Sequence, residues 1–374
     1  MAKILIPTRV RYAFAGGVSE MIQMLGTVSQ RSGHSLIDLD RTIIAGRYPY
    51  HPRTLMLVLM RRLAHLKTLA FFESYFPRIG MVFFQTSLGS NSLRRDVAYM
   101  RRCSKTGRPF AVFVHGWDER FATKLSKSPS CYRNLANTLN QAKRIFVLAP
   151  SFAETLSSWG VKSGKVSIET TMIDDSILKG FDIGRKAASR THRQGLRILF
   201  MSRIVREKGV YETVEAFRLH RRNWPSSSLV IAGVGRELEA VKAKVQRDSI
   251  QNVHFAGFVE GVEKRSLFTD ADVFLFPSFY GEGLPIVLLE AMALGCTLVT
   301  RPVGGVDHLF RSPEMGYLEA SLEPGRYAAI LNELAANPES WAEAARFNHQ
   351  FAKQNTLASR VGQRILDEVI RDAG

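Results

Sequence analysis

The sequence is poor in cysteine, with three in 374 residues: Cys103, Cys131 and Cys296. Their number is odd and their spacing fits no metal-binding motif, so neither a disulfide framework nor a structural zinc site is expected. Free thiols are typical of proteins kept in a reducing compartment. The sequence therefore predicts a cytoplasmic protein with three free cysteines.

The chain also lacks a long apolar run. Residues 54–60 form one of the longest, and they end at Arg61 and Arg62, well short of the ~18 residues that a membrane span needs. The first ten residues, MAKILIPTRV, carry a charge but too short an apolar stretch for a signal peptide. We expect neither a membrane-spanning helix nor a secretory leader.

Acidic residues are scarce in the first half only. Residues 1–190 contain 29 Lys and Arg against 12 Asp and Glu, whereas residues 191–374 contain 22 of each. The formal net charge of +17 therefore belongs entirely to the first half. Such a charge attracts nucleic acid, anionic lipid or phosphorylated substrates, and composition alone leaves all three open.

Short apolar runs alternate with helical patterns along the whole chain. Several runs are apolar without alternation, as in parallel strands that helices cover on both faces. This pattern predicts an α/β protein with doubly wound sheets. The strand candidates are 3–7, 35–39, 80–85, 109–115, 144–149, 165–169, 196–201, 228–234, 252–256, 272–277 and 296–301.

The length suggests two domains, at roughly 150 residues each. Residues 183–195, IGRKAASRTHRQG, are polar and lack an apolar period, so they are expected to be a linker. The prediction is a Rossmann-like domain over 1–182, a second over 196–355, and a helix within 356–374 that could cross back to the first domain. The two domains are expected to face each other across a cleft.

Two acids stand out in an apolar stretch of the second half. In YGEGLPIVLLEAMALG, residues 280–295, Glu282 and Glu290 lie eight positions apart. Carboxylates are rarely buried without partners, and they accept strong hydrogen bonds from sugar hydroxyls. Two carboxylates at different depths could hold two sugars. An N-terminal cap and a surface glutamate would explain them equally well.

The same stretch predicts an anion site. Pro285 suits the first turn of a helix, so the amides of Gly283 and Leu284 are expected near a helix start, where N–H groups attract anions. Earlier, FMSRIVREKG places Arg203 and Lys208 in a loop after a strand. Two cations there suit a diphosphate, although a solvated basic loop looks the same.

The first half offers weaker signals. AFAGG, residues 13–17, follows the first strand, and adjacent glycines Gly16 and Gly17 let a ligand approach the backbone. It is not GxGxxG, so a dinucleotide fingerprint is absent. VHGWDER places His115 at the end of another strand, where a lone histidine is more often structural than catalytic. No convincing DxD-like metal pair is found, and no metal is expected.

Taken together, these motifs resemble those of the retaining glycosyltransferases of family 4, which have the two-domain GT-B fold. The resemblance is strongest over 196–318. EGLPIVLLEAMALG is similar to the family's E-x7-E motif, RIVREKG to its R-x4-K-G, AGG at 15–17 to its glycine loop, HGWD to the segment that carries its histidine, and PVGG at 302–305 to a later loop.

The resemblance implies a role for each matched residue. Arg203 and Lys208 would bind the donor diphosphate, Glu282 the hydroxyls of the transferred sugar, and Glu290 the ribose hydroxyls. The remaining roles fall to residues near the reacting sugar and the phosphates: His115 beside the sugar, Gly16 and Gly17 over the phosphates, and Gly283 and Leu284 at the helix start. It also implies no required metal or cofactor, and no protein nucleophile.

Two segments depart from the family pattern. Asp307 and His308 stand where a Pro-Glu pair is common, which puts the role of that loop in doubt. Residues 54–76 mix Leu, Met and Phe with Arg61, Arg62, His65 and Lys67, as expected for either a membrane-interface helix or a core helix with a basic face.

The resemblance therefore predicts a retaining hexosyltransferase that uses a nucleotide diphosphate sugar. Its acceptor would be a lipid-linked or growing glycan of a surface polysaccharide or lipopolysaccharide. The basic first half would hold the protein at the inner face of an anionic membrane. A sugar-nucleotide epimerase of the same fold stays open, as does a basic nucleic-acid-binding protein, although no nucleic-acid-binding module is recognisable.

Overall fold

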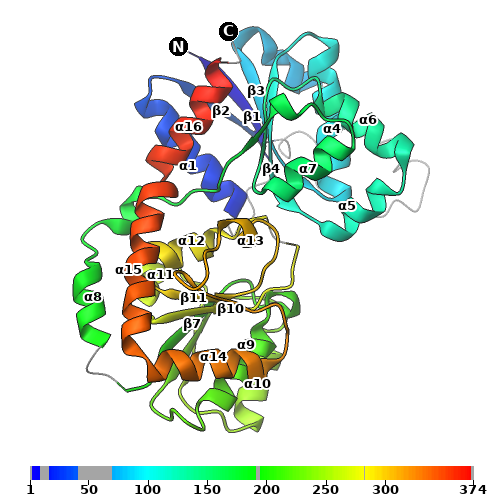
Figure 1. The fold of residues 1–374 in the computed structure, drawn as a ribbon. Coiled ribbons are helices and arrows are strands. Elements are labelled where there is room, and N and C mark those ends of the chain that lie inside the picture. Colours follow the sequence, from blue (N-terminus) through cyan, green and yellow to red (C-terminus); the bar gives the residue numbers. More distant parts are fainter. Residues whose placement is uncertain (1, 9–16, 41–69, 191–193, 282, 372–374) are drawn as a thin grey trace. The chain divides into compact units, whose positions relative to one another are not determined.

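The computed structural model describes residues 2–8, 17–40, 70–190, 194–281 and 283–371. The chain forms two compact units, each built on its own parallel sheet with helices (Figure 1). Unit 1 comprises Met1–Thr171 and Ala358–Gly374, and unit 2 comprises Met172–Leu357. The predicted α/β class with two Rossmann-like sheets is confirmed.

The sheet of unit 1 has six parallel strands in the order β2-β1-β3-β4-β5-β6. Their bounds are β1 Lys3–Thr8, β2 Ser35–Asp40, β3 Met81–Leu88, β4 Phe110–Trp117, β5 Ile145–Val147 and β6 Val166–Ile168. The central pair, β3 and β4, is almost wholly buried. That burial explains why both strands are continuous apolar runs instead of alternating ones.

Aromatic side chains fill both faces of this sheet. On one face Phe72 packs edge-on against Tyr99, with ring centroids 5.1 Å apart. On the other, Phe113 lies 5.7 Å from Phe146. The helices of unit 1 are α1 Gly17–Arg31, α4 Ser90–Lys105, α5 Glu119–Ser126, α6 Pro129–Leu139, α7 Pro150–Ser158 and α16 Ala358–Arg371.

The last helix, α16, belongs to unit 1 although it follows unit 2 in sequence. It packs beside α1, and the Ser32 hydroxyl donates to Gln363 at 2.7 Å (Figure 1). Arg364 pairs with Glu169 at 2.7 Å. The helix buries one apolar face and keeps its charged residues for such pairs, which is the pattern expected of an amphipathic helix on a sheet domain.

The sheet of unit 2 also has six parallel strands, in the order β12-β11-β10-β7-β8-β9. Their bounds are β7 Arg197–Met201, β8 Ser228–Ala232, β9 Val253–Gly257, β10 Val273–Phe276, β11 Thr297–Thr300 and β12 Gly316–Leu318. The short edge strand β12 was not among the predicted strands, because its three residues form no apolar run.

The helices of unit 2 alternate with these strands. They are α8 Ile183–Arg190, α9 Val210–His220, α10 Leu238–Arg247, α11 Gly261–Asp270, α12 Ile286–Ala293, α13 Val306–Leu309, α14 Pro324–Ala336 and α15 Pro338–Asn355. His220, fully buried at the end of α9, contacts Asn332 of α14 at 2.8 Å and Ser227 at 2.8 Å. One histidine thus joins two helices to the start of β8.

The predicted linker 183–195 was wrong over most of its length, since residues 183–190 form α8 inside unit 2. The unit boundary falls after Thr171 and not after residue 182. Basic residues misled the prediction because they are buried here. The Lys186 ammonium donates to the carbonyls of Phe268 at 3.0 Å and Leu294 at 2.6 Å, and Arg190 faces the buried Asp272 at 3.7 Å.

All three cysteines are free, as predicted. Cys131 is exposed, whereas Cys103 and Cys296 are buried. Burial raises the pKa of the Cys103 thiol to about 12, which makes it unreactive. In the part of the chain that the structure describes, no helix is both long and apolar enough to cross a membrane.

Candidate active site

Most of the predicted site residues of unit 2 lie at one edge of its sheet. Strands β10, β7 and β8 are neighbours and run parallel, so the loops that follow them emerge at the same carboxyl edge. The described residues of these loops are 277–281, 283–285, 202–209 and 233–237. In doubly wound sheets ligands bind at this edge.

Two cations and one aromatic ring meet there. Arg203 lies with its guanidinium carbon 5.6 Å from the centroid of Tyr280, and the Lys208 ammonium lies 4.6 Å from the same ring. Lys208 is 7% exposed and also lies 5.6 Å from the Phe276 ring. The aromatic faces favour a cation held out of bulk water. The structure therefore brings together the two cations that the sequence predicted.

The loop that carries Lys208 is fastened to the loop after β10. The amide of Phe279 donates to the Glu207 carbonyl at 2.9 Å. Gly209 has φ +80°, and a Cβ there would lie 2.4 Å from the Pro277 carbonyl oxygen. Only glycine fits this approach without strain. The close contact fixes the position of the Lys208 backbone against β10.

Two glycines in residues 231–239, IAGVGRELE, also allow a close contact between loops. A Cβ on Gly233 would lie 1.8 Å from the Ser202 carbonyl oxygen, and one on Gly235 would lie 2.2 Å from that of Ile204. The amide of Ile204 donates to the Val234 carbonyl at 2.9 Å. These glycines therefore let the loops after β7 and β8 pack backbone to backbone, which supports the Arg203 loop from behind.

The loop that carries Arg203 and Lys208 also contains a carboxylate, that of Glu207. Glu207 pairs with Arg236 of the neighbouring loop at 2.8 Å. A hydrogen bond from its own backbone amide, and then Arg236, lower the pKa of this carboxyl. Glu207 thus stays ionised and keeps Arg236 beside the Arg203 loop.

Only part of the E-x7-E stretch lies among the described residues. Glu282 lies outside the described residues. The Gly283 carbonyl accepts from the amide of Gly305 at 2.5 Å, and Leu284 is buried. Helix α12 begins at Ile286, with Pro285 as its N-cap residue and not in its first turn as predicted. Gly283 and Leu284 therefore precede the helix.

Glu290 lies in the second turn of α12, and 12% of its side chain is exposed. Its carboxylate pairs with the ammonium of Lys264, on α11, at 2.6 Å. The other residues of α12 are mostly buried and apolar. The ion pair explains how a carboxylate can lie in so apolar a helix, because a partly buried charge needs a partner.

His115 belongs to unit 1. It lies at the carboxyl end of β4, is 9% exposed, and stacks on Phe113 with centroids 4.1 Å apart. Its Nε2 lies 2.5 Å from Oε1 of Gln85 on β3. Burial lowers the pKa of His115 to about 3, so the imidazole is neutral at physiological pH.

The glycine loop of unit 1 is mostly outside the described residues. Gly16 is among those not described, and Gly17 is the first residue of α1. Unit 1 therefore holds His115 and Gly17, and unit 2 holds Arg203, Lys208 and Glu290.

The loop that departs from the family pattern forms a short helix. Asp307 and His308 are both exposed on α13, which begins directly after Gly305. Gly305 in turn contacts Gly283. The pair thus lies next to the segment that leads into α12.

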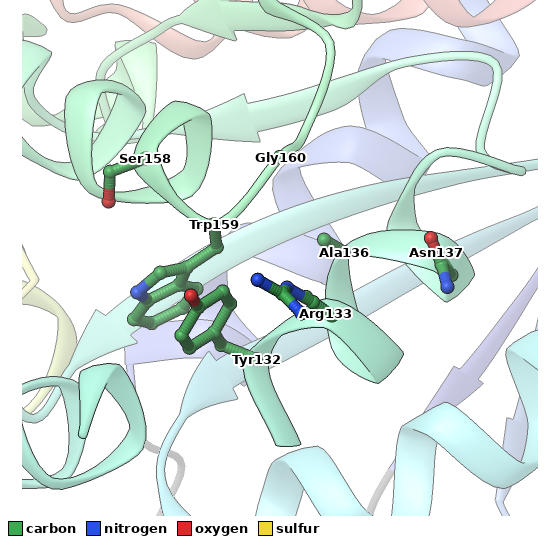
Figure 2. Close-up of a pocket in the computed structure, with 7 residues that line it drawn as sticks. All are labelled: Tyr132, Arg133, Ala136, Asn137, Ser158, Trp159 and Gly160. Carbon is green, nitrogen blue, oxygen red and sulfur yellow. The ribbon is translucent and has the colours of Figure 1, made fainter. Parts of the chain in front are cut away.

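A shallow hollow of about 370 Å³ lies elsewhere in unit 1, between α6 and the C-terminal end of α7 (Figure 2). Trp159 and Tyr132 lie with ring centroids 6.4 Å apart. Its lining residues are Tyr132, Arg133, Ala136, Asn137, Ser158, Trp159 and Gly160. The hollow contains none of the predicted site residues, and its lining residue Trp159 stacks on Trp117, the last residue of β4, with ring centroids 6.5 Å apart.

Three residues of these clusters were missed by the sequence analysis: Tyr280, Lys264 and Gln85. For Tyr280 the sequence did contain a signal, because this residue lies two positions before Glu282, the first acid of the E-x7-E motif. Lys264 and Gln85 had none, because each is distant in sequence from the residue that it contacts.

The buried histidines predict a pH dependence of stability. Burial holds the pKa of His115 at about 3 and that of His220 at about 4, both below the ~6.5 of an unfolded chain. A lowered pKa stabilises the fold above ~6.5, and this stability is lost as the pH falls toward the folded values. Each histidine should remove about 1.4 kcal/mol per pH unit below ~6.5.

Urea unfolding between pH 7 and pH 5 measures this effect. The variant His220→Asn is the comparison, because asparagine keeps hydrogen-bonding capacity without titrating. Its free energy of unfolding should fall less steeply than that of the wild type. Equal slopes would contradict a buried neutral His220.

The family model described as "Glycosyl transferases group 1" matches residues 185–353. The putative colanic acid biosynthesis glycosyltransferase WcaL of Salmonella typhimurium is 25% identical over 233 residues, which are 60% of this chain and 55% of that protein. The phosphatidyl-myo-inositol mannosyltransferase of Mycobacterium tuberculosis is 31% identical over 140 residues, 37% of this chain and 36% of that protein.

The chain thus spans about half the length of these relatives, or less. Among solved structures, Anabaena Alr3699/HepE in complex with UDP-glucose is similar, with a TM-score of 0.73, 17% identity, and coverage of 99% of this chain and 100% of that one. Residues 185–353 therefore match the glycosyl transferases group 1 family, within a chain that resembles the family 4 glycosyltransferases and has their GT-B fold.

Proposed function

We propose that this protein is a retaining glycosyltransferase that moves a hexose-type sugar from a nucleotide diphosphate sugar to an acceptor hydroxyl. The observation that carries the proposal is the meeting of Arg203 and Lys208 at Tyr280, on the carboxyl edge of the unit 2 sheet. The neighbour HepE is a complex with UDP-glucose, which supports a nucleotide sugar as the donor.

In the proposed reaction the bond between the sugar and the diphosphate breaks, and negative charge grows on the leaving phosphate. Lys208 and Arg203 stabilise that charge, and the low exposure of Lys208 strengthens the attraction. A cation about 4 Å from a phosphate is worth on the order of 4 kcal/mol at an effective dielectric constant of ~20. Because two such cations stabilise the charge of the leaving diphosphate, the proposed mechanism contains no metal.

Glu290 is proposed to hold the ribose hydroxyls, and Glu282 those of the transferred sugar. The contact with Lys264 bears on this role, because the ion pair fixes the position of the Glu290 carboxylate before the donor arrives. A pre-positioned acceptor loses less side-chain entropy on binding. Retention is proposed to follow from attack on the same face that the diphosphate leaves: the acceptor oxygen bonds to the sugar carbon, its proton passes to the departing phosphate, and no protein nucleophile is needed.

A donor screen tests the proposal. Purified protein is mixed with UDP-, GDP- and ADP-sugars, and the melting temperature is recorded, since ligand binding stabilises the fold by RT ln(1 + [L]/Kd). The donor that raises it most is then assayed with and without EDTA, and the anomeric configuration of the product is read by NMR. Failure of every donor to bind would defeat the function, an inverted product would defeat retention, and loss of turnover in EDTA that a divalent metal restores would defeat the metal-free mechanism.

The acceptor is proposed to be a lipid-linked or growing glycan of surface polysaccharide assembly. The names of the relatives support this class, because one acts in colanic acid biosynthesis and another is a phosphatidyl-myo-inositol mannosyltransferase. The charge of the first half adds support, since 29 cations against 12 anions in residues 1–190 suit an anionic lipid surface. We propose a cytoplasmic protein at the inner face of the membrane.

Some cations of α4 are neutralised by acidic partners and contribute less to such a surface. Arg95 pairs with the buried Asp96 at 2.8 Å, and Arg102 pairs with Glu73. Lys105, by contrast, is exposed. Of the predicted segment 54–76, residues 54–69, with Arg61, Arg62 and Lys67, lie outside the described residues, whereas Phe72 and Phe76 are buried in unit 1.

Vesicle binding is therefore expected to depend on charge. The wild type should co-sediment with vesicles that contain anionic lipid, and less so as salt rises, because surface charges are screened beyond about 8 Å at physiological ionic strength. Replacing Arg61, Arg62 and Lys67 by Glu should release the protein, whereas Arg236→Glu in unit 2 should not. Equal binding to neutral and anionic vesicles would contradict the prediction, as would tight, salt-resistant binding to nucleic acid in a gel shift.

A further inference from the structure

The residue that contacts His115 is a buried glutamine on the neighbouring strand. Gln85 of β3 lies opposite Phe113 of β4, and His115 lies at an irregularity in the pairing of the two strands, where its side chain contacts both of these residues. Gln85 is 7% exposed and His115 is 9% exposed. Phe113 stacks on the imidazole at 4.1 Å and fixes the plane of the ring.

The hydrogen bond between the two side chains selects one form of the histidine. Gln85 Oε1 lies 2.5 Å from His115 Nε2, and an amide oxygen can only accept. Nε2 must therefore carry the proton. Since the imidazole is neutral, Nδ1 is left with a lone pair, and no described residue donates a hydrogen bond to it.

The other end of the same amide has no acceptor. Gln85 Nε2 is buried and has no hydrogen-bond partner in the part of the chain that the structure describes. Buried polar groups are nearly always paired, so an unpaired one in a native protein calls for a functional explanation.

We infer that Gln85 is a positioning residue of the sugar site: it holds His115 as the Nε2–H tautomer so that Nδ1 accepts a hydrogen bond from a hydroxyl of the bound sugar. The inference rests on the proposed function and adds the residue that sets the chemistry of His115. In this form His115 neither gives nor takes a proton during turnover. It discriminates by hydrogen bonding alone, favouring a sugar with a hydroxyl at that position over one without it.

The tautomer can be measured without any donor. A long-range ¹H–¹⁵N correlation spectrum of the full chain, labelled with ¹⁵N-histidine, separates the two neutral tautomers and imidazolium. The His115 signal is assigned by its loss in His115→Asn. We expect His115 as Nε2–H from pH 8 to pH 5.

The chain supplies its own reference in this spectrum. His220 is buried with Nδ1 at 2.8 Å from Asn332 Oδ1 and Nε2 at 2.8 Å from the Ser227 hydroxyl. By the same argument it is the Nδ1–H tautomer. One spectrum should therefore show both neutral forms, and only the His115 signal should respond to substitutions at Gln85.

Two variants connect the tautomer to the reaction. Gln85→Met keeps the length of the side chain and removes the hydrogen bond, so kcat/KM should fall about tenfold at every pH while the melting temperature is retained. Gln85→Glu keeps an acceptor but adds a negative charge, which raises the pKa of His115 from about 3. That variant should approach wild-type kcat/KM at pH 8 and lose it toward pH 5, where imidazolium has no acceptor; the wild type should show no such loss from His115.

Each experiment has a result that would overturn the inference. His115 as Nδ1–H or imidazolium in the free wild type would overturn the inference, and so would unchanged kcat/KM in Gln85→Met. A Gln85→Glu profile without the acid-side loss would do the same. Because the spectrum is recorded without donor, its failure leaves the proposed glycosyl transfer standing, whereas failure of every donor to bind would defeat that function and leave the tautomer result intact.

Discussion

Replacing Lys208 by alanine is expected to lower kcat by roughly 10²–10³-fold, the range found when one group that stabilises developing negative charge is removed. The ammonium lies in a loop that Gly209 and Glu207 fasten to the strand beside it, so it is already positioned before the donor binds. Arg203→Ala should act in the same direction with a smaller effect, since Arg203 is exposed and Lys208 is buried.

The effect should appear mainly in kcat because charge on the diphosphate grows as the sugar leaves. An interaction that strengthens in the transition state changes kcat, whereas one that is equal in both states changes KM only. Lys208 also stacks against Tyr280 and Phe276. Lys208→Met keeps that apolar packing and removes only the charge, so it should lose turnover with little change in melting temperature.

Arg206 provides a matched control for this prediction. It lies two residues from Lys208 in the same loop, is exposed, and stacks on Tyr211 at 5.6 Å instead of on Tyr280. Arg206→Ala should leave kcat near the wild-type value. Wild-type kcat/KM in Lys208→Met, or an equal loss in Arg206→Ala, would show that Lys208 does not act on the diphosphate.

Removing the carboxylate of Glu290 should weaken donor binding. Hydrogen bonds to a charged group are worth roughly 1.5–3 kcal/mol, so Glu290→Ala should raise the Kd of the donor and of its free nucleotide by about 10–150-fold. Both should weaken together, because the proposed contact is with the ribose that they share. Isothermal calorimetry measures the two constants.

Lys264 provides a second test of the role of Glu290. Since Lys264 fixes the Glu290 carboxylate at 2.6 Å, Lys264→Met should also weaken nucleotide binding, and the double variant should lose less than the sum of the two single losses. Glu239→Ala is the control, because this exposed glutamate of α10 pairs with Lys242 at 2.9 Å on its own helix. Unchanged nucleotide affinity in Glu290→Ala would refute the ribose assignment.

The central strands could be predicted because both faces of each sheet are buried there. Residues buried on both sides must be apolar throughout, and a run such as MVFF or VFLF is visible without any knowledge of its neighbours. The edge strand β12 has only Gly316–Leu318 and mostly half-buried positions. Its strand conformation comes from pairing with β11, which no local pattern announces.

The failure at α8 has a different cause. Lys186 and Arg190 have the composition of a solvated segment, and exposure is the usual state of such residues. Here carbonyl oxygens at the ends of α11 and α12 accept from Lys186, and Asp272 faces Arg190. Those partners are 82 and 108 residues away for Lys186, so only folding brings them within reach.

By itself the sequence determined the α/β class, the charge asymmetry, and the two cations of the R-x4-K-G loop, because each depends on residue type and local spacing. Tertiary structure decided what those residues contact. It placed Tyr280 under both cations, paired Glu290 with Lys264, and set Gln85 against His115. Such contacts join strands and helices that are distant in the chain, and a carboxylate or an imidazole acquires its charge state and hydrogen-bonding role only from the groups that burial brings within about 3 Å.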